Sequence, residues 1–291
     1  MFVPNREAGY PATNEAFSSR YPQASDYAVT PAGIQRNVQL ASALEPLVFS
    51  PEKTTRQADC HPGQRFAFFV TAGVNIGESF RALGERLVQA RTENATSQPL
   101  LYDTALAAQI DSKRQRDGGR TNHGIISMLV PLVASQVLYL ERTPDPDNID
   151  DVFANLGRVM ASTTIADVRA VQQMENLAFE MSGWTDRLRE EELYSGQTVL
   201  EYYEAKRDGT GRAMYAELAS GQPRTQDILA EVLEPRKEID PDQGFQDIFS
   251  AACHRVLDGL PSSYHPQLLA DNTAAALYVV LSHFSEEEII F

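Results

Sequence analysis

The chain has 291 residues, 43% of them hydrophobic, and its 40 acidic and 25 basic side chains give a formal net charge of -15. This composition predicts a globular protein with a substantial core and argues against disordered and fibrous classes. The acidic balance argues against nucleic acid and anionic membranes as partners, because the overall field repels phosphates.

The sequence shows no clear pattern for a membrane-spanning helix, a secretory signal or a disulfide. The longest apolar run, 124–140, is interrupted by proline and polar residues and falls short of the roughly 18 to 20 uncharged residues of a membrane-spanning helix. The N-terminal stretch has neither a basic start nor an apolar segment, so we expect no secretory signal and a cytoplasmic location. Cys60 and Cys253 lack CxxC spacing, which predicts ordinary free thiols rather than a disulfide or zinc site.

Helical periodicity begins after an N-terminal arm, residues 1–30, that we expect to pack loosely. Thr30 and Pro31 are typical of a helix start, and apolar residues then recur over 34–44. The same spacing of three and four continues over 66–87, where we expect one long helix.

Glycines and an apolar run mark the next region. Gly73 and Gly77 would allow close packing of the expected helix over 66–87 against a neighbour.

A shorter helix is expected over 101–110. The run over 124–140 is apolar nearly all round, and such a helix is usually central.

The second half of the chain continues the helical pattern. Apolar residues form one stripe over 149–159, and Thr164 and Asp167 have the spacing of a capping box. Further helices are expected at 197–218, 225–234, 244–258 and 266–284, with 219–243 as a polar connection or insertion. The sequence therefore predicts an all-α protein with a single multi-helix domain, residues 31–291, around a central apolar helix.

A short basic segment precedes the apolar run. Within eight residues it holds four basic side chains, opposed by one acidic residue: Lys113, Arg114, Arg116, Arg120 and, against them, Asp117. Gly118 and Gly119 lie inside it, and Asn122 and His123 would open the buried helix. Helix N-terminal N–H groups together with guanidinium groups favour phosphate. We interpret the segment as a site for a phosphorylated ligand. The alternative is a solvated basic loop that only caps the helix, since neither a Walker nor a Rossmann fingerprint is present.

Six segments resemble, in matching order, those of one enzyme family. The segment "DGGRTNHGIISMLVPLVAS" resembles a Gly-Asn-Thr-Asn-x-Gly stretch and the apolar helix after it, and "VQLASALEPLVFSPEKTTRQAD" resembles an N-terminal helix with a Ser-Pro-Lys-Pro-Gly loop. "FFVTAGVNIGESFRAL", "ASTTIADVRAV", "AKRDGTGRAMYAEL" and "FQDIFSAACHRVL" resemble further helices. Together, over roughly 36–285, they resemble the triphosphoribosyl-dephospho-CoA synthase family, especially its archaeal-type branch.

The resemblance implies an all-helical enzyme that moves the 5-triphosphoribosyl group of ATP to the 2'-hydroxyl of dephospho-CoA and releases adenine. It therefore implies ATP as substrate, a CoA-like acceptor and Mg²⁺, and it leaves a homodimer open. Breaking an N-glycosidic bond passes through an oxocarbenium-like state, which calls for carboxylates near the ribose. The triphosphate calls for cations, and the incoming hydroxyl calls for a base.

Matching positions assign roles by this resemblance. The residues expected to hold phosphate are Lys53, Arg56, Gly119, Arg120, Thr121, Asn122 and Arg207. Asp167 and Asp208 would act on the ribose or hold the metal, and His123 would deprotonate the acceptor hydroxyl. Each of the last three has an alternative: Asp167 could only cap its helix, Asp208 could form a surface pair with Arg207, and His123 could be structural.

The chain also departs from the family. "EKTTRQAD" lacks the expected proline and glycine, Arg120 replaces the first Asn of Gly-Asn-Thr-Asn, and "ENLAFEMSGW" replaces a glycine-rich stretch. The late Asp-Thr-x-Ile-Ala-Arg-Lys-Gly stretch is expected near "SHFSEEEIIF" but is not found there. Two alternatives therefore stay open: an inactive helical protein that binds a nucleotide or phospho-ligand, and a helical interaction scaffold.

Overall fold

The computed structural model describes residues 30–48, 65–95, 97–114, 121–139, 149–183, 197–208, 212–233, 245–260 and 266–283, and helices are the only regular elements among them. In chain order they are α3 (Pro31–Leu44), the 3₁₀-helix η1 (Glu45–Leu47), α4 (Phe66–Asn75), α5 (Gly77–Thr92), α6 (Tyr102–Asp111), α7 (His123–Tyr139), α8 (Ile149–Ala154), α9 (Leu156–Ala161), α10 (Ile165–Met181), α11 (Val199–Lys206), α12 (Arg212–Ala219), α13 (Pro223–Leu233), α14 (Phe245–Asp258) and α15 (Pro266–His283). The all-α prediction is confirmed.

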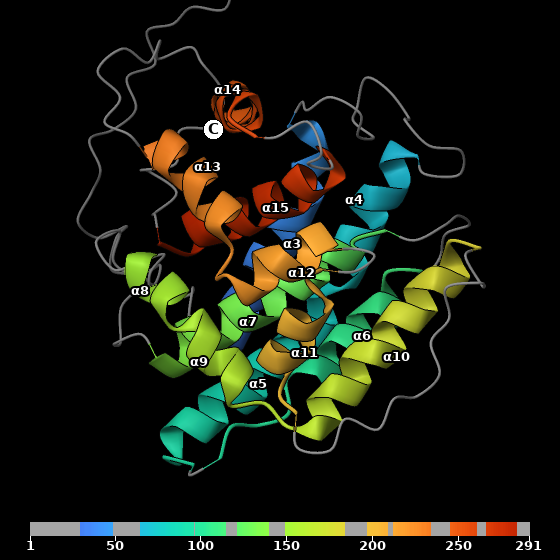
Figure 1. Cartoon of the computed structure of the whole chain (residues 1–291), viewed down its shortest axis with the longest axis vertical. Coiled ribbons are helices and arrows are strands. Elements are labelled where there is room, and N and C mark those ends of the chain that lie inside the picture. The colour runs from blue at the N-terminus through green and yellow to red at the C-terminus, as the bar shows by residue number, and fades with distance from the viewer. Residues whose placement is uncertain are drawn as a thin grey trace, which may run out of the picture.

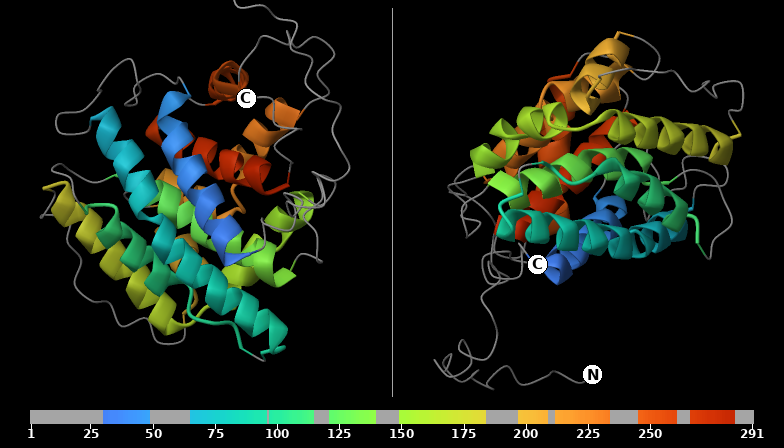
Figure 2. Two further views of the ribbon diagram at one scale, coloured as in Figure 1. Left: turned by 180° about the vertical axis from the view of Figure 1, so that it is seen from behind. Right: turned by 90° about the horizontal axis from the view of Figure 1, so that it is seen from below.

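These helices share one core and form one compact domain. A continuous cluster of buried apolar side chains runs from Ile34 on α3 to Val280 on α15. Figure 2 shows α3 on the back of the molecule, where it passes over α15 and lies beside α4, and it is in contact with α4, α5 and α15. In the view from below, α10, α6 and α5 form successive layers, with α6 between the other two.

Helix α7 is buried along almost its whole length. Every residue from His123 to Val137 is buried, and the helix packs against α5, α6, α8, α9 and α15 (Figure 1). Its polar side chains bond to neighbouring helices. Ser135 Oγ donates to the carbonyl of Val152 at 2.6 Å, and Gln136 Oε1 accepts from the Tyr278 hydroxyl at 2.5 Å. Burial favours protein partners for the polar groups of α7, although Nε2 of Gln136 has none among the described residues.

The helix starts follow the local signals in the sequence. Thr30 Oγ accepts from the N–H of Gly33 at 3.0 Å, and Pro31 occupies the first turn of α3, as predicted. Thr164 and Asp167 form the predicted capping box of α10.

Three expected single helices are divided. The one over 66–87 breaks at Ile76, where Gln39 Nε2 on α3 donates to the carbonyl of Val74 at 2.7 Å and so competes with the helical bond. The stripe over 149–159 breaks at Asn155, whose Nδ2 donates to the carbonyl of Asp151 at 2.8 Å. The segment 197–218 forms α11 and α12 instead of one helix.

A helix was expected over 225–234, and α13 (Pro223–Leu233) confirms it. The expectation that 219–243 is a polar connection or insertion is wrong for the described part of this stretch. Helix α13 packs against α14 and α15, and Ile228, Leu229 and Val232 are buried in the common core. Apolar residues every three to four positions give α13 a core-facing side that its polar residues obscure in the sequence.

Two sequence predictions concern cysteine and membranes. Cys253 is a buried free thiol, with Sγ 3.1 Å from Thr273 Oγ, whereas Cys60 and the arm 1–29 lie outside the described residues. No helix in the described ranges has both the length and the apolar character needed to cross a bilayer.

A buried glutamate joins α12 to α13. Glu217 Oε1 accepts from the N–H of Arg224, at the start of α13, at 2.8 Å. Burial raises the pKa of Glu217 to about 7, against the opposing effect of the N–H groups of Arg224 and Thr225. This carboxylate therefore caps α13 at the cost of its own desolvation.

The stability of the protein is predicted to fall as pH rises from about 4.5 to about 7. Below this window Glu217 is protonated in both the folded and unfolded states, and above it the folded state must hold a buried carboxylate. The loss attributable to Glu217 is up to roughly 3 kcal/mol. Urea unfolding at pH 5 and pH 8 measures this loss of stability, and the loss between the two pH values should be smaller in Glu217→Gln than in the wild-type protein. Glu201→Gln, at an exposed capping glutamate, is the control; an unchanged loss in Glu217→Gln contradicts the assignment.

Gly73 brings α4 close to α3, and adding a methyl group there is predicted to be destabilising. A β-carbon at residue 73 would lie 2.9 Å from Ser42 Cβ and 3.0 Å from the backbone of residues 42 and 43. Because backbone must move, we expect Gly73→Ala to cost about 1–3 kcal/mol in chemical unfolding. Gly157→Ala on α9 is the matched control, since nothing lies within 4 Å of its added β-carbon. Equal effects of the two changes would refute the close approach.

Candidate functional site

The strongest candidate site is the N-terminal end of α7, directly after the arginine-rich segment. Thr121, Asn122 and His123 are all buried there, with 2%, 4% and 8% of their surface exposed. Four other residues expected to hold phosphate, Lys53, Arg56, Gly119 and Arg120, lie outside the described residues.

Asn122 begins α7 in an unusual conformation. Its φ is 58°, in the left-handed region that Asn tolerates better than most residues, and its carbonyl accepts from the N–H of Ile126 at 2.8 Å. Neither Nδ2 nor Oδ1 of its side chain has a hydrogen-bond partner among the described residues. A buried polar group without a partner costs about 1–3 kcal/mol. A ligand that bonds to this amide would remove the cost.

Gln109 on α6 holds both ends of the basic segment. Its Nε2 donates to Ser112 Oγ at 3.2 Å and to the carbonyl of Thr121 at 3.4 Å. On its other side, Oε1 lies 3.2 Å from Nδ1 of His123. One fully buried amide therefore ties the residues on either side of 113–120 to the imidazole at the start of α7.

The beginning of the basic segment is also anchored. Arg114 forms an ion pair of 2.9 Å with Asp111, and Asp111 accepts from the Ser79 hydroxyl at 2.6 Å. Asn75 Nδ2 donates to the carbonyl of Arg114 at 2.8 Å. These bonds connect the segment to α4, α5 and α6. Part of the charge of Arg114 is compensated by Asp111.

Asp271 on α15 reaches the same end of α7 and was not predicted from the sequence. A β-carbon added at Gly124 would overlap the carboxylate of Asp271, so this carboxylate lies beside the first turn of α7. The neighbouring Asn272 accepts from the Thr225 hydroxyl at 2.8 Å. The available signal was the polar group Asp271-Asn272-Thr273 inside an otherwise apolar helix.

The position of Asp271 changes the electrostatics expected for the site. A carboxylate near a helix N-terminus takes the place that the dipole offers to an anion. A phosphate at the same spot would be repelled by Asp271. Any phosphate must therefore be held by arginine side chains or a bound cation, and the helix end is better suited to hydroxyl groups.

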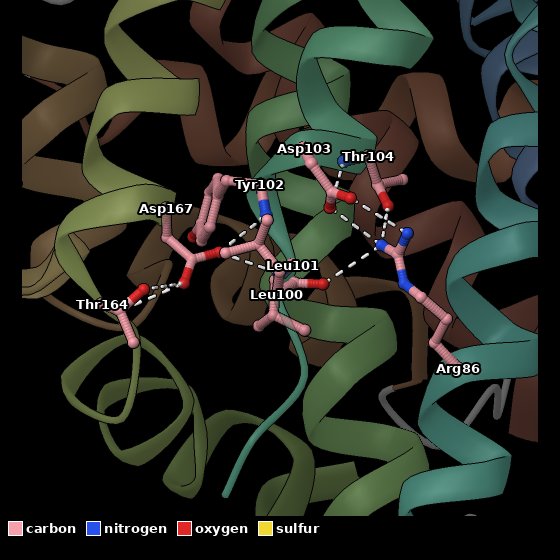
Figure 3. A network of polar contacts seen from close by, with 8 residues as sticks. All are labelled: Arg86, Leu100, Leu101, Tyr102, Asp103, Thr104, Thr164 and Asp167. Carbon is pink, nitrogen blue, oxygen red and sulfur yellow. Dashed lines mark hydrogen bonds and ion pairs between the residues drawn. The ribbon is translucent and has the colours of Figure 1, made fainter.

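Asp167 serves a different purpose from the one expected by resemblance. Its Oδ1 accepts from the N–H groups of Leu101 and Tyr102 at 2.8 and 3.0 Å, and its Oδ2 accepts from the N–H and hydroxyl of Thr164 at 3.1 and 3.3 Å (Figure 3). The side chain is 1% exposed. It therefore caps α10 and binds the start of α6, which is the structural alternative stated above.

Arg207 and Asp208 are exposed residues after the C-terminal end of α11. At the other end of α11, the N–H of Val199 donates to Thr163 Oγ at 2.8 Å. About 12 Å of helix thus separates Asp208 from the turn that carries Asp167. Across the described residues, no group of three or more His, Cys, Asp or Glu side chains could hold a metal ion. The structure gives the paired metal role of these carboxylates no support.

A buried glutamate inside the bundle has tyrosine partners. Glu175 on α10 accepts from the hydroxyls of Tyr202 at 2.7 Å and Tyr215 at 2.9 Å, and Tyr203 stacks on Tyr215 with a centroid distance of 5.8 Å. Burial raises the pKa of Tyr203 well above its ordinary value. We assign this cluster a structural role, because it joins α10, α11 and α12.

Comparisons of the chain with protein-family models, with curated proteins and with solved structures gave no match. The resemblance to the triphosphoribosyl-dephospho-CoA synthase family rests on the sequence motifs alone.

Replacing Asp167 is predicted to reduce stability rather than ligand affinity. Each carboxylate oxygen of Asp167 accepts two hydrogen bonds, and Asp167→Asn replaces one of these oxygens by an NH₂ group that cannot accept them. We therefore expect the free energy of unfolding to fall by about 2–3 kcal/mol in chemical unfolding. Asp103→Asn is the control from the same network, since the Asp103–Arg86 pair is 40% and 38% exposed and should cost about 1 kcal/mol or less. A loss of nucleotide affinity at full stability would instead favour the catalytic assignment.

Proposed function

We propose that the N-terminal end of α7 binds the triphosphoribosyl part of ATP and that the protein transfers this group to an alcohol, with release of adenine. The first candidate for the acceptor is 3'-dephospho-CoA, by resemblance. The observation that carries the proposal is the buried amide of Asn122, which has no hydrogen-bond partner among the described residues and lies two positions after a segment with four basic residues.

Two kinds of protein group would bind the two parts of the ligand, the ribose and the triphosphate. The amide of Asn122 can donate to and accept from a hydroxyl, and the carboxylate of Asp271 accepts hydroxyl protons, which suits a ribose. The arginines of 113–120 suit the triphosphate, since guanidinium forks match phosphate oxygens. Mg²⁺ is usually held by one or two carboxylates together with phosphate oxygens, and Asp271 is the carboxylate that this end of α7 offers.

The proposed reaction makes one bond and breaks one. The acceptor hydroxyl oxygen attacks C1' of the ribose, and the bond from C1' to N9 of adenine breaks with its electron pair leaving on adenine. His123 takes the proton of the hydroxyl, and adenine takes up a proton from solvent or from the site. Negative charge of Asp271 beside the ribose would stabilise the oxocarbenium character of the transition state.

Binding without transfer is the second candidate. One specific observation favours it: the carboxylate of Asp167, expected to act at the ribose, is engaged in four hydrogen bonds to the protein itself. A nucleotide would then be a ligand that stabilises the fold and remains intact.

Incubation with ATP, Mg²⁺ and dephospho-CoA is predicted to release adenine, which chromatography detects. Release that depends on the acceptor supports transfer. A raised melting temperature with ATP, without adenine across a panel of alcohols, supports the binding protein. If ATP neither raises the melting temperature nor yields adenine, both candidates fail and the interaction scaffold remains.

The variant Asn122→Gly tests the site itself. Glycine keeps the left-handed backbone and removes the amide, so we expect the affinity for ATP to fall about tenfold, because one or two hydrogen bonds are lost. Asn94→Gly is the matched control, since Asn94 also has a positive φ, 50°, but lies in an exposed turn after α5. Equal affinities of the two variants would remove Asn122 from the site.

A further inference from the structure

We infer that Gln109 is a positioning residue, which holds His123 in the tautomer that carries its proton on Nδ1. In this tautomer Nε2 is the nitrogen that can take a proton. The catalytic meaning of the inference rests on the proposed function, whereas the tautomer follows from the hydrogen bonds around Gln109.

The orientation of the Gln109 amide is fixed by two acceptors. Ser112 Oγ donates its proton to the carbonyl of Gln109 at 2.7 Å, so toward the amide it can only accept. The carbonyl of Thr121 can only accept as well. Both lie on the side of the Gln109 NH₂ group, at 3.2 and 3.4 Å. Rotating the amide by 180° would place an oxygen against two acceptors, so Oε1 faces His123.

The tautomer of His123 follows from this orientation. Oε1 of Gln109 has no proton to donate, and the imidazole Nδ1 lies 3.2 Å from it. Nδ1 must therefore carry the proton, and in a neutral ring the lone pair is then on Nε2. Gln109 is fully buried and His123 is 8% exposed, so bulk water competes weakly for this bond.

The same amide connects the base to the phosphate segment. Thr121, which accepts from Gln109, directly follows Arg120 in the chain. Thr121 can move away only if the amide loses one of the two acceptors that orient it. Gln109 therefore links the position of Thr121 to the orientation of the proton acceptor.

The decisive measurement is the tautomer in the wild-type protein. In protein labelled with ¹⁵N-histidine, long-range ¹H–¹⁵N correlation spectra distinguish a protonated ring nitrogen from an unprotonated one, and His123→Gln assigns the resonances. We expect a protonated Nδ1 and an unprotonated Nε2 for His123 at a pH where the ring is neutral. A proton on Nε2 would overturn the inference, whatever the protein does with ATP.

A variant then tests the link to transfer. Gln109→Met keeps the side-chain volume but can neither fix the imidazole nor hold Thr121, so we expect a mixture of tautomers. In the transfer assay kcat should fall by roughly 10- to 100-fold, a part of the 10²- to 10⁴-fold that a general base contributes, with the KM for the acceptor within about twofold. Gln136→Met is the matched control, because Gln136 is equally buried on α7 and bonds to Tyr278.

The two proposals fail in different ways. If His123 carries its proton on Nδ1 and no acceptor yields adenine, the proposed transfer fails and the role of Gln109 in it falls too, leaving only the tautomer. If adenine is released and Gln109→Met changes neither the tautomer nor kcat, the inference about Gln109 fails and the transferase stands. If the variant does not fold, the wild-type spectra still decide the tautomer.

Discussion

The burial of α7 from His123 to Val137 constrains the rest of the structure. A helix without a solvent-exposed side depends on protein partners for its polar groups, and its first turn has N–H groups that no carbonyl of the helix can reach. Side chains from distant parts of the chain lie against α7: Gln109 from α6 faces the imidazole of His123, Tyr278 from α15 donates to Gln136, and the carboxylate of Asp271 from α15 lies beside Gly124. Gln109 and Asp271 come from two separate helices, so α6 and α15 both bring polar side chains to the N-terminal end of α7. Asn122 is informative because both Nδ2 and Oδ1 of its buried side chain lack a partner among the described residues, whereas Gln136 lacks one for Nε2 alone.

Most of the helices could be predicted from the sequence, because apolar spacing and capping residues are local. The capping bonds of Thr30, Thr164 and Asp167 reach no farther than four residues along the chain, so these capping roles follow from the sequence pattern. The breaks at Ile76 and Asn155 could not be predicted with the same ease. At Ile76 the cause lies on another helix, in the amide of Gln39. At Asn155 the side-chain bond to the carbonyl of Asp151 interrupts the helix without interrupting the apolar spacing, so the spacing does not reveal the break.

The candidate site was predictable only in part, for a related reason. Asn122 and His123 were singled out because they follow a run of arginines, a feature visible along the chain. Gln109 is one ordinary glutamine on an apolar helix, and Asp271 is nearly 150 residues from Gly124 in the chain. Their proximity to the start of α7 depends on how α6, α7 and α15 pack. Asp167 illustrates the opposite case: its acidic side chain was expected to act on a ligand, and its bonds to Leu101 and Tyr102 show a structural function.

The contact between Gly124 and Asp271 ties two positions into one unit. A carboxylate can lie beside the first turn of α7 only while residue 124 has no side chain, since any β-carbon would occupy the space of that carboxylate. The two positions should therefore evolve together. In a descendant of this chain, a larger residue at 124 would be tolerated if position 271 became shorter, and the start of α7 would then lose its negative neighbour. The site could in that way exchange a preference for hydroxyl groups for a preference for anions, through two substitutions in helices that otherwise keep their packing.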